Sequence, residues 1–130
     1  MTGNCHCGSG LIYNNCCAIF HKNVALPETA EQLMRSRYSA YALKLIDYLV
    51  DTTHKDKLKS SYRTKLVSTI HDFQWIGLEI IKSSNGKADD KVGKVLFEAS
   101  YKEGDSEGVM REHSRFKKVA GKWFYYDGKG

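Results

Sequence analysis

All four cysteines of this 130-residue chain lie within its first seventeen residues. They form two close pairs separated by eight residues, namely Cys5, Cys7, Cys16 and Cys17. Four thiolates closing on one ion are the usual ligand set of a structural zinc site. Gly8 and Gly10 favour a tight turn after the first pair, where released backbone amides and the Ser9 hydroxyl can donate to the sulfurs. We therefore expect a closed zinc site with no open position for a catalytic water.

The same residues leave two alternatives open. His21 lies one helical turn after Cys17 and can replace it as the fourth ligand, whereas His6, between two ligands, is expected to face solvent. Disulfides or redox thiols are the other alternative, but no apolar signal segment follows Met1 and no further cysteine is present to pair. Zinc is the preferred interpretation. Reduced cysteines without a signal segment indicate a cytoplasmic protein.

The cysteine segment resembles the SEC-C motif, a small zinc-binding segment found at the carboxyl end of the SecA translocation ATPase and in many other bacterial proteins. That motif reads Cys-x-Cys-Gly-Ser-Gly-x-x-Tyr, two residues, then Cys followed by Cys or His, and every fixed position is present here. The resemblance implies that the four cysteines hold zinc. It also implies contact with protein partners or ribosomes rather than catalysis.

Composition limits what the rest of the chain can do. A hydrophobic content of 42% fills one modest core. The formal charge is +5 with neutral thiols, and four thiolates with one zinc ion lower it to about +3. That value weakens the case for a dedicated nucleic-acid binder. No run of about eighteen apolar residues is present, so no membrane span is expected.

Helical spacing follows Pro27, the only proline in the chain. Thr29 and Gln32 form a capping-box signature that opens a helix. Its apolar face is predicted to run through Ala30, Leu33, Met34, Tyr38 and Tyr41, and through Leu45, Ile46 and Leu49 if the helix is prolonged or kinked near Tyr41. A second helix is predicted from apolar residues at every fourth position, namely Leu58, Tyr62, Leu66 and Ile70.

Strand patterns occupy the remainder. Four strands are predicted, over residues 73–82, 92–102, 109–118 and 122–127. Residues 83–90 and 103–108 have hairpin-turn composition, and Ala120-Gly121 makes a third tight connection. Helices followed by consecutive hairpins indicate an α+β class, with a curved antiparallel sheet packed on the helices. We expect a zinc-binding segment over residues 1–22 and an α+β domain over residues 28–130.

The second part of the chain is similar to the bacterial YchJ family. The similarity rests on five ordered segments: Thr29–Tyr38, Asp47-Tyr48-Leu49 with Thr53-His54, Trp75–Leu78, Glu112–Phe116 and Trp123–Gly128. It implies a middle domain with the cone-shaped nuclear-transport-factor-like, or cystatin-like, fold. Members often carry a second SEC-C segment at the carboxyl end, and these 130 residues contain one copy, so a function that needs two is not expected. The family has no established activity, so the resemblance implies a fold rather than a reaction.

Arg37 is the most unusual residue outside the cysteine segment, because helical spacing places it on the face of Leu33 and Tyr41. An arginine that faces a core is costly unless it is paired. We therefore expect an acidic partner from the sheet, with three candidates: Glu98, Glu112 and Asp127. A structural ion pair is the preferred interpretation, and an anion-binding group in a pocket is the alternative. Arg35 is expected to be solvated.

One strand carries a possible acid–base group. His113 and Arg115 alternate with Glu112, Ser114 and Phe116, so the two sets face opposite sides of the sheet. If His113 faces the concave side, it can act as an acid or base beside Glu79 or Tyr125. Cone-shaped folds host binding domains as well as isomerases and dehydratases, so we expect binding rather than catalysis.

Aromatic residues with neighbouring lysines offer a possible RNA contact. The rings are Trp75, Trp123, Phe124, Tyr125 and Tyr126, and the nearby lysines are Lys117, Lys118 and Lys122. A further basic run lies on the second predicted helix, at Lys55, Lys57, Lys59, Arg63 and Lys65. Such runs are usually solvated surfaces, and here they would serve chiefly in ribosome association.

The expected function is that of a zinc-binding adaptor. Its zinc segment would contact a protein partner, in the translation or secretion machinery, or the ribosome itself. The alternative is a small-molecule-binding or catalytic cone domain in which zinc only stabilises the fold. Neither interpretation fixes the oligomeric state.

Overall fold

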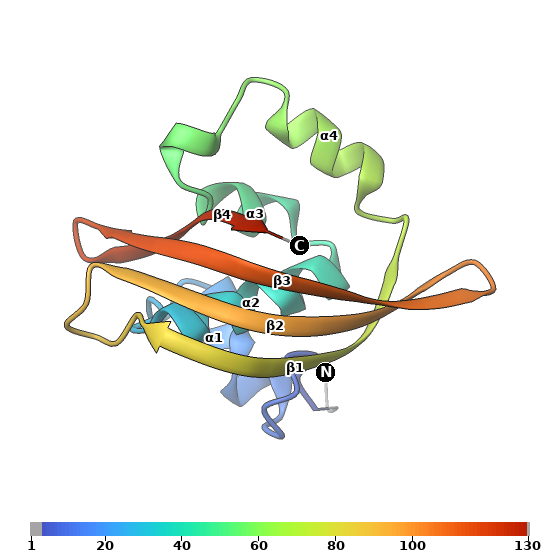
Figure 1. Cartoon of the computed structure of the whole chain (residues 1–130), viewed down its shortest axis with the longest axis horizontal. Coiled ribbons are helices and arrows are strands. Elements are labelled where there is room, and N and C mark those ends of the chain that lie inside the picture. Colours follow the sequence, from blue (N-terminus) through green and yellow to red (C-terminus); the bar gives the residue numbers. More distant parts are fainter. Residues whose placement is uncertain (1–3, 130) are drawn as a thin grey trace.

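The computed structural model describes residues 4–129 and shows a four-stranded antiparallel sheet with helices on one face (Figure 1). In chain order the elements are η1 (Tyr13–Asn15), α1 (Cys17–His21), α2 (Ala30–Leu43), α3 (Ile46–Asp51), η2 (Lys55–Lys57), α4 (Tyr62–Thr69), β1 (Gln74–Asn85), β2 (Val92–Glu103), β3 (Ser106–Val119) and β4 (Lys122–Lys129). The strands lie side by side in the order β1-β2-β3-β4. The α+β class and the helices-then-hairpins order are confirmed.

Helix α2 is the main helix against the sheet. Its predicted cap is confirmed, because the Thr29 side chain accepts a hydrogen bond from the backbone amide of Gln32 at 3.1 Å. The helix ends where Lys44 adopts a left-handed backbone conformation with φ 62°, and α3 begins two residues later. The predicted apolar face is therefore divided between two helices instead of continuing along one.

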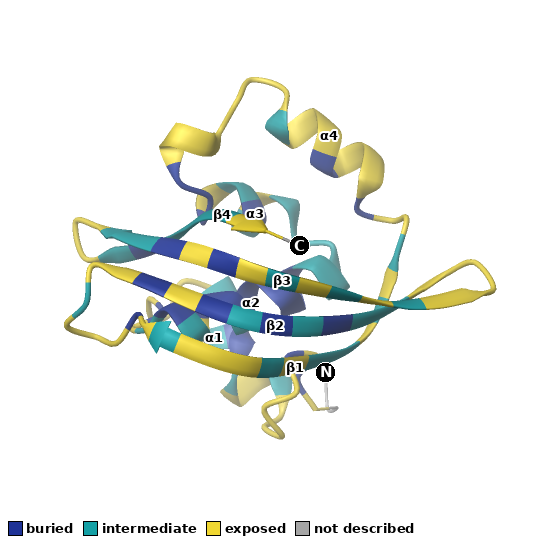
Figure 2. Ribbon diagram, in the orientation of Figure 1, coloured by how far each residue is buried: buried dark blue, intermediate teal, exposed yellow. Residues whose placement is uncertain are grey.

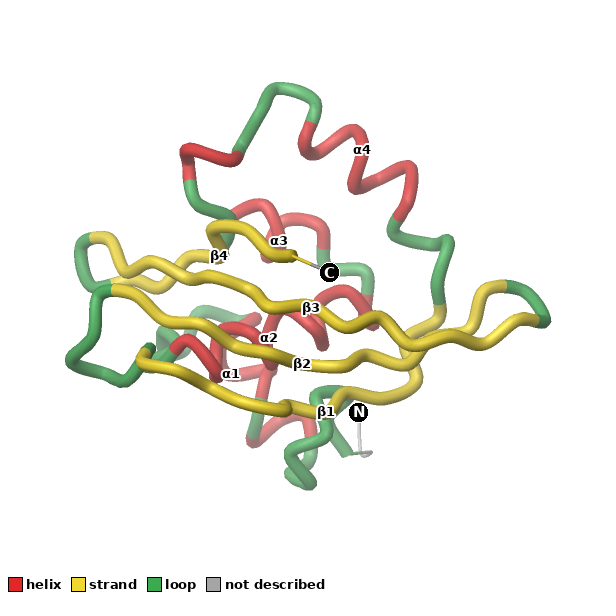
Figure 3. The backbone as a smooth tube through the Cα atoms, in the orientation of Figure 1, coloured by secondary structure: helices red, strands yellow, loops and turns green. Residues whose placement is uncertain are grey.

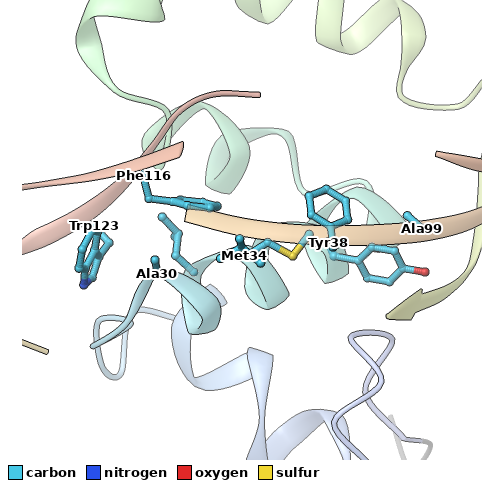
Figure 4. Packing of buried hydrophobic residues seen from close by; sticks show 9 residues of the cluster. Ala30, Met34, Tyr38, Ala99, Phe116 and Trp123 are labelled. Atoms are coloured by element: carbon cyan, nitrogen blue, oxygen red, sulfur yellow. The ribbon is translucent and has the colours of Figure 1, made fainter. Parts of the chain in front are cut away.

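The core lies between α2 and the concave face of the sheet. Figure 4 shows Met34 and Tyr38 of α2 beside Phe116 and Ala99 of the sheet. Trp123 is buried near the amino-terminal end of α2, where its indole nitrogen donates to the carbonyl of Glu28 at 3.0 Å. Burial alternates along β2, as expected for a strand with one face on a core.

Helix α4 is shorter than predicted. It begins at Tyr62, because residues 55–57 form a 3-10 turn that is capped by His54, and Leu58 after this turn is exposed. Within α4 only Leu66 is buried, followed by Ile70 just after the helix. Figure 2 shows that most of α4 faces solvent and that the helix stands apart from the strands.

The strands are longer than predicted at most of their ends, and the turns are correspondingly shorter. The segment after α3 also joins the sheet: the amide of His54 donates to the carbonyl of Tyr125, and the amide of Tyr125 donates to the carbonyl of Thr52, both at 2.8 Å. Figure 3 shows this segment passing β4. No helix within residues 4–129 is long and apolar enough to cross a membrane.

Candidate metal centre and interior cavity

The structure brings the four cysteine sulfurs into one cluster. The Sγ atoms of Cys5, Cys7, Cys16 and Cys17 all lie within 4.8 Å of one another, and all four cysteines are free thiols. The Cys7 and Cys16 sulfurs are 3.6 Å apart, and those of Cys16 and Cys17 are 4.0 Å apart. A tetrahedral zinc ion with bonds of about 2.3 Å would separate its sulfurs by about 3.8 Å. The cluster is therefore compatible with a four-thiolate metal centre.

Backbone turns set up this cluster. Gly8 follows the first cysteine pair with φ 78°, in the region that glycine adopts without strain. The amide of Cys5 donates to the carbonyl of Leu11 at 2.8 Å, which folds the loop back on itself. The second pair lies at the start of α1, where Cys17 is its first residue. Two local turns thus direct both pairs toward one point.

Hydroxyl groups surround the sulfurs. Ser9 Oγ lies 3.2 Å from Cys16 Sγ, as the sequence indicated. Ser39 of α2 donates to Cys17 Sγ at 3.4 Å and lies 3.3 Å from Cys5 Sγ. The backbone amide of Cys7 also donates to the Cys5 sulfur and lowers the pKa of that thiol, so hydroxyls act beside the kind of amide donor that we expected. Ser39 was missed because its approach to the cysteines depends on tertiary packing.

The cysteine segment packs on the α+β domain at the β1 edge (Figure 1). Leu78 of β1 contacts the buried cysteines. Arg35 of α2 donates from Nη1 to the carbonyl of Cys7 at 2.7 Å and pairs with Glu31 at 3.2 Å. The expectation of a solvated Arg35 is therefore wrong, because this side chain links α2 to the first cysteine pair.

His21 is not part of the cluster. Its Nδ1 lies 2.7 Å from the Tyr13 hydroxyl, and its Nε2 lies 2.8 Å from the carbonyl oxygen of Ser36. Both ring nitrogens are therefore engaged, and Cys17 supplies the fourth sulfur. His6 is exposed, as expected.

The sulfurs favour a cation electrostatically. A hydrogen bond from Cys17 lowers the pKa of the Cys5 thiol, and the same contact raises the pKa of Cys17. Burial raises the pKa of Cys16. A second thiolate beside the first is therefore unfavourable unless a positive charge lies between them. A divalent metal ion would supply that charge.

Arg37 faces the interior as predicted, but the prediction that it pairs with an acidic residue is wrong. Its side chain is 5% exposed, and Nη1 donates to Leu49 O at 2.9 Å, Thr52 Oγ1 at 2.7 Å and Thr53 Oγ1 at 3.2 Å. Its guanidinium carbon lies 4.7 Å from the centre of the Tyr125 ring. Among the described residues no carboxylate lies within 4.0 Å of Arg37. Neutral acceptors from the end of α3 replace the ion pair.

The three candidate carboxylates have other partners. Glu98 lies 3.5 Å from Arg111. Asp127 accepts from Nε of Arg115 at 2.6 Å, and this hydrogen bond lowers the pKa of Asp127. Glu112 accepts from the hydroxyls of Ser114 and Tyr125, the latter at 3.2 Å.

His113 points away from the core. Alternate burial along β3 leaves His113 and Arg115 exposed, whereas Glu112, Ser114 and Phe116 face inward. Glu79 is exposed on β1. The expected acid–base group of His113 with Glu79 or Tyr125 is therefore wrong, because the pleat turns His113 to the outer face. Trp123 is buried, so this ring is not available to stack on an RNA base.

A cavity of about 260 Å³ lies between α2, the end of α4 and the concave face of the sheet. Its wall is largely apolar and includes the rings of Trp75, Phe97 and Phe116. Its charged lining residues are Arg37 and Glu112. The hydroxyl-bearing rings of Tyr41 and Tyr125 also line it, and burial raises the pKa of both.

Comparison with known proteins gives the same family in sequence and in structure. The family model described as "YchJ, middle NTF2-like domain" matches residues 29–128. A UPF0225 protein of Actinobacillus succinogenes is 42% identical over 128 residues, which cover 98% of this chain and 82% of that protein. A UPF0225 protein of Vibrio parahaemolyticus is 41% identical over 98% of this chain and 75% of its own length.

Two solved structures match nearly the whole chain. A solution structure of a SEC-C motif containing protein from Rhodopseudomonas palustris has a TM-score of 0.86 and 32% identity, and the match covers 98% of both chains. A crystal structure of a SEC-C motif containing protein from Psychrobacter arcticus has a TM-score of 0.79 and 28% identity, over 95% of this chain and 80% of that one. Together with the cysteine cluster and the helix-on-sheet domain, these matches show that the chain belongs to the YchJ, or UPF0225, family.

Proposed function

We propose that the cysteine cluster holds one zinc ion in a structural role. The support is its chemistry: four soft thiolates at tetrahedral separations form a closed set that matches structural zinc sites. Hydroxyl donors at Ser9 and Ser39 stabilise thiolate charge. Native mass spectrometry of the whole chain, isolated without added reductant, should find one zinc and four reduced thiols, and the mass of two disulfides instead would contradict this assignment.

We propose further that the loop between the two cysteine pairs binds a protein partner. The observation that carries this proposal is an exposed apolar pair on that loop: Leu11 is 53% exposed and Ile12 is 42% exposed. The loop is held at both ends by ligand cysteines, so metal binding would fix its shape before an encounter. Apolar side chains on a preorganised surface lower the cost of association. A closed ligand set also supports binding rather than metal-assisted catalysis.

A quantitative pull-down from native cell lysate tests the loop. A double variant, Leu11→Ser with Ile12→Ser, keeps all four cysteines, and Val67→Ser on α4 is the matched control because Val67 is 54% exposed. The wild-type chain and the control should capture the same partner. The loop variant should bind it about 30-fold more weakly, because apolar anchors at interface centres are worth about 2 kcal/mol or more.

Metal content and ribonuclease separate the possible outcomes. The loop variant must retain its metal and its folded sheet for the comparison to count. Equal recovery by the loop variant would remove the loop as the contact surface. Loss of the partner after ribonuclease treatment would mean that the chain reaches it through RNA or the ribosome.

A further inference from the structure

The described part of the protein supplies hydrogen-bond acceptors to only one nitrogen of the Arg37 guanidinium. Nη1 has three acceptors, whereas Nε and Nη2 have none among the described residues. Every fully buried side-chain nitrogen or oxygen in residues 4–129 has a partner, so these two nitrogens keep some accessible surface. Arg37 lines the cavity and is 5% exposed overall. The cavity is the open space that this side chain lines, so it is where an external acceptor could reach the free edge.

The positive charge of Arg37 has no direct ionic partner within residues 4–129, although the Glu112 side chain lines the same cavity. Three neutral acceptors and the ring of Tyr125 compensate the charge in part, but no carboxylate of the described residues pairs with it. Removing a charge from water without a partner is costly. The Nε and Nη2 edge presents two parallel donors, and this geometry matches the two oxygens of a carboxylate.

We propose that this cavity binds a small organic monocarboxylate whose carboxylate accepts hydrogen bonds from Nε and Nη2 of Arg37. Its apolar body packs against the rings of Trp75, Phe97 and Phe116, which line the same space. The volume of about 260 Å³ lies just below the range of about 300–1,000 Å³ usual for drug-sized ligands, so the ligand is compact. This site is separate from the loop proposed to bind a partner.

Glu112 restricts the ligand further. It lines the cavity, and its Oε2 already accepts from the Tyr125 hydroxyl. A negative side chain in the same space opposes a second negative charge on the ligand, which disfavours dicarboxylates and phosphates. The proposed specificity is therefore for one carboxylate on an apolar body.

Protein-observed NMR on the zinc-loaded whole chain tests this with phenylacetate as the probe. Up to about 10 mM, phenylacetate should shift the Arg37 Nε–H signal and the amides of Ala99 and Glu112 in a saturable way. Phenylacetamide, which lacks the charge, should bind about tenfold more weakly or worse, since hydrogen bonds to charged groups exceed neutral ones. Absence of saturable shifts, or equal affinity for the amide, would overturn the proposal.

Variants of Arg37 test whether this residue binds the carboxylate. Arg37→Met should abolish the shifts, and Arg37→Lys, which keeps the charge but loses the paired donors, should weaken binding about tenfold. Arg115→Met on the outer face is the matched control and should bind as the wild type does. Wild-type affinity in Arg37→Lys would overturn the bidentate assignment.

Glu112→Gln keeps an acceptor for Tyr125 and removes the negative charge. This variant should increase the affinity for phenylmalonate, a dianion, more than the affinity for phenylacetate. If both ligands change equally, Glu112 does not select against a second charge. Thermal unfolding of each variant identifies those that fold, and the acid–amide comparison in the wild type stands even if Arg37→Met does not fold.

Discussion

His21 lies in a partly buried chain of hydrogen bonds that joins the cysteine segment to α2. Tyr13, His21 and Ser36 are its members, and the Ser36 hydroxyl continues to Tyr48 at 2.6 Å. His21→Phe should retain one zinc but lower the free energy of unfolding by about 1–3 kcal/mol, because the Ser36 carbonyl and the Tyr13 hydroxyl lose a partner. Urea unfolding with native mass spectrometry measures both. Loss of zinc would mean that His21 is a ligand, and His6→Phe, at an exposed position, is the control.

The same histidine gives a pH dependence. Burial lowers the pKa of His21 below its ordinary value of about 6.5, so the folded protein holds it neutral. The unfolded chain then binds the proton more readily, and the stability that His21 contributes is present above about pH 6.5 and is lost as the pH falls below that value. The wild-type chain should therefore lose more stability than His21→Phe between pH 7 and pH 5. If the free energy of unfolding of the two proteins changes equally with pH, the neutral His21 ring of the folded state is contradicted.

The β1–β2 hairpin meets the first turn of α2 at a point that only glycines allow. A Cβ at Gly93 would lie 2.5 Å from the Cα of Gly86, and the amide of Ala30 donates to the Gly86 carbonyl at 2.8 Å. Gly93→Ala should therefore cost about 3 kcal/mol or more, since backbone must shift. Gly77→Ala is the matched control, because its Cβ would meet only the Ser100 side chain at 3.9 Å. Urea unfolding of both variants checks this, and similar midpoints would contradict the close approach.

Elements with local signals could be predicted from the sequence, and those fixed by tertiary contacts could not. The cap at Thr29 and the alternation along β2 depend on residues a few positions apart, and both are present in the structure. The end of α2 at Lys44 requires a left-handed residue that is not a glycine, so no turn signal marked it. Leu58 continued a helical spacing, but the 3-10 turn after His54 took that residue out of the helix.

At the scale of the whole molecule, the same distinction separates the two sites. The four cysteines lie within thirteen consecutive residues, so their clustering could be predicted from spacing. The surroundings of Arg37 could not, because its acceptors come from the end of α3 and the segment after it rather than from a patterned strand. Burial of the arginine followed from helical periodicity, whereas the identity of its partners depended on how α2 and α3 pack.

The cysteine segment and the sheet should lose stability together when metal is removed. Three residues of α2 form hydrogen bonds with the segment: Arg35 with Cys7, Ser39 with Cys17 and Cys5, and Ser36 with His21. At about 1 kcal/mol each, their loss should lower the melting temperature by roughly 10 °C. Trp75 and Trp123 report this by fluorescence, since both lie in the sheet.

Arg35→Met should reduce the difference in melting temperature between the zinc-loaded and chelated proteins. Arg111→Met, in an exposed ion pair, should leave that difference unchanged. An unchanged tryptophan transition after complete chelation would mean that the segment folds independently of the sheet.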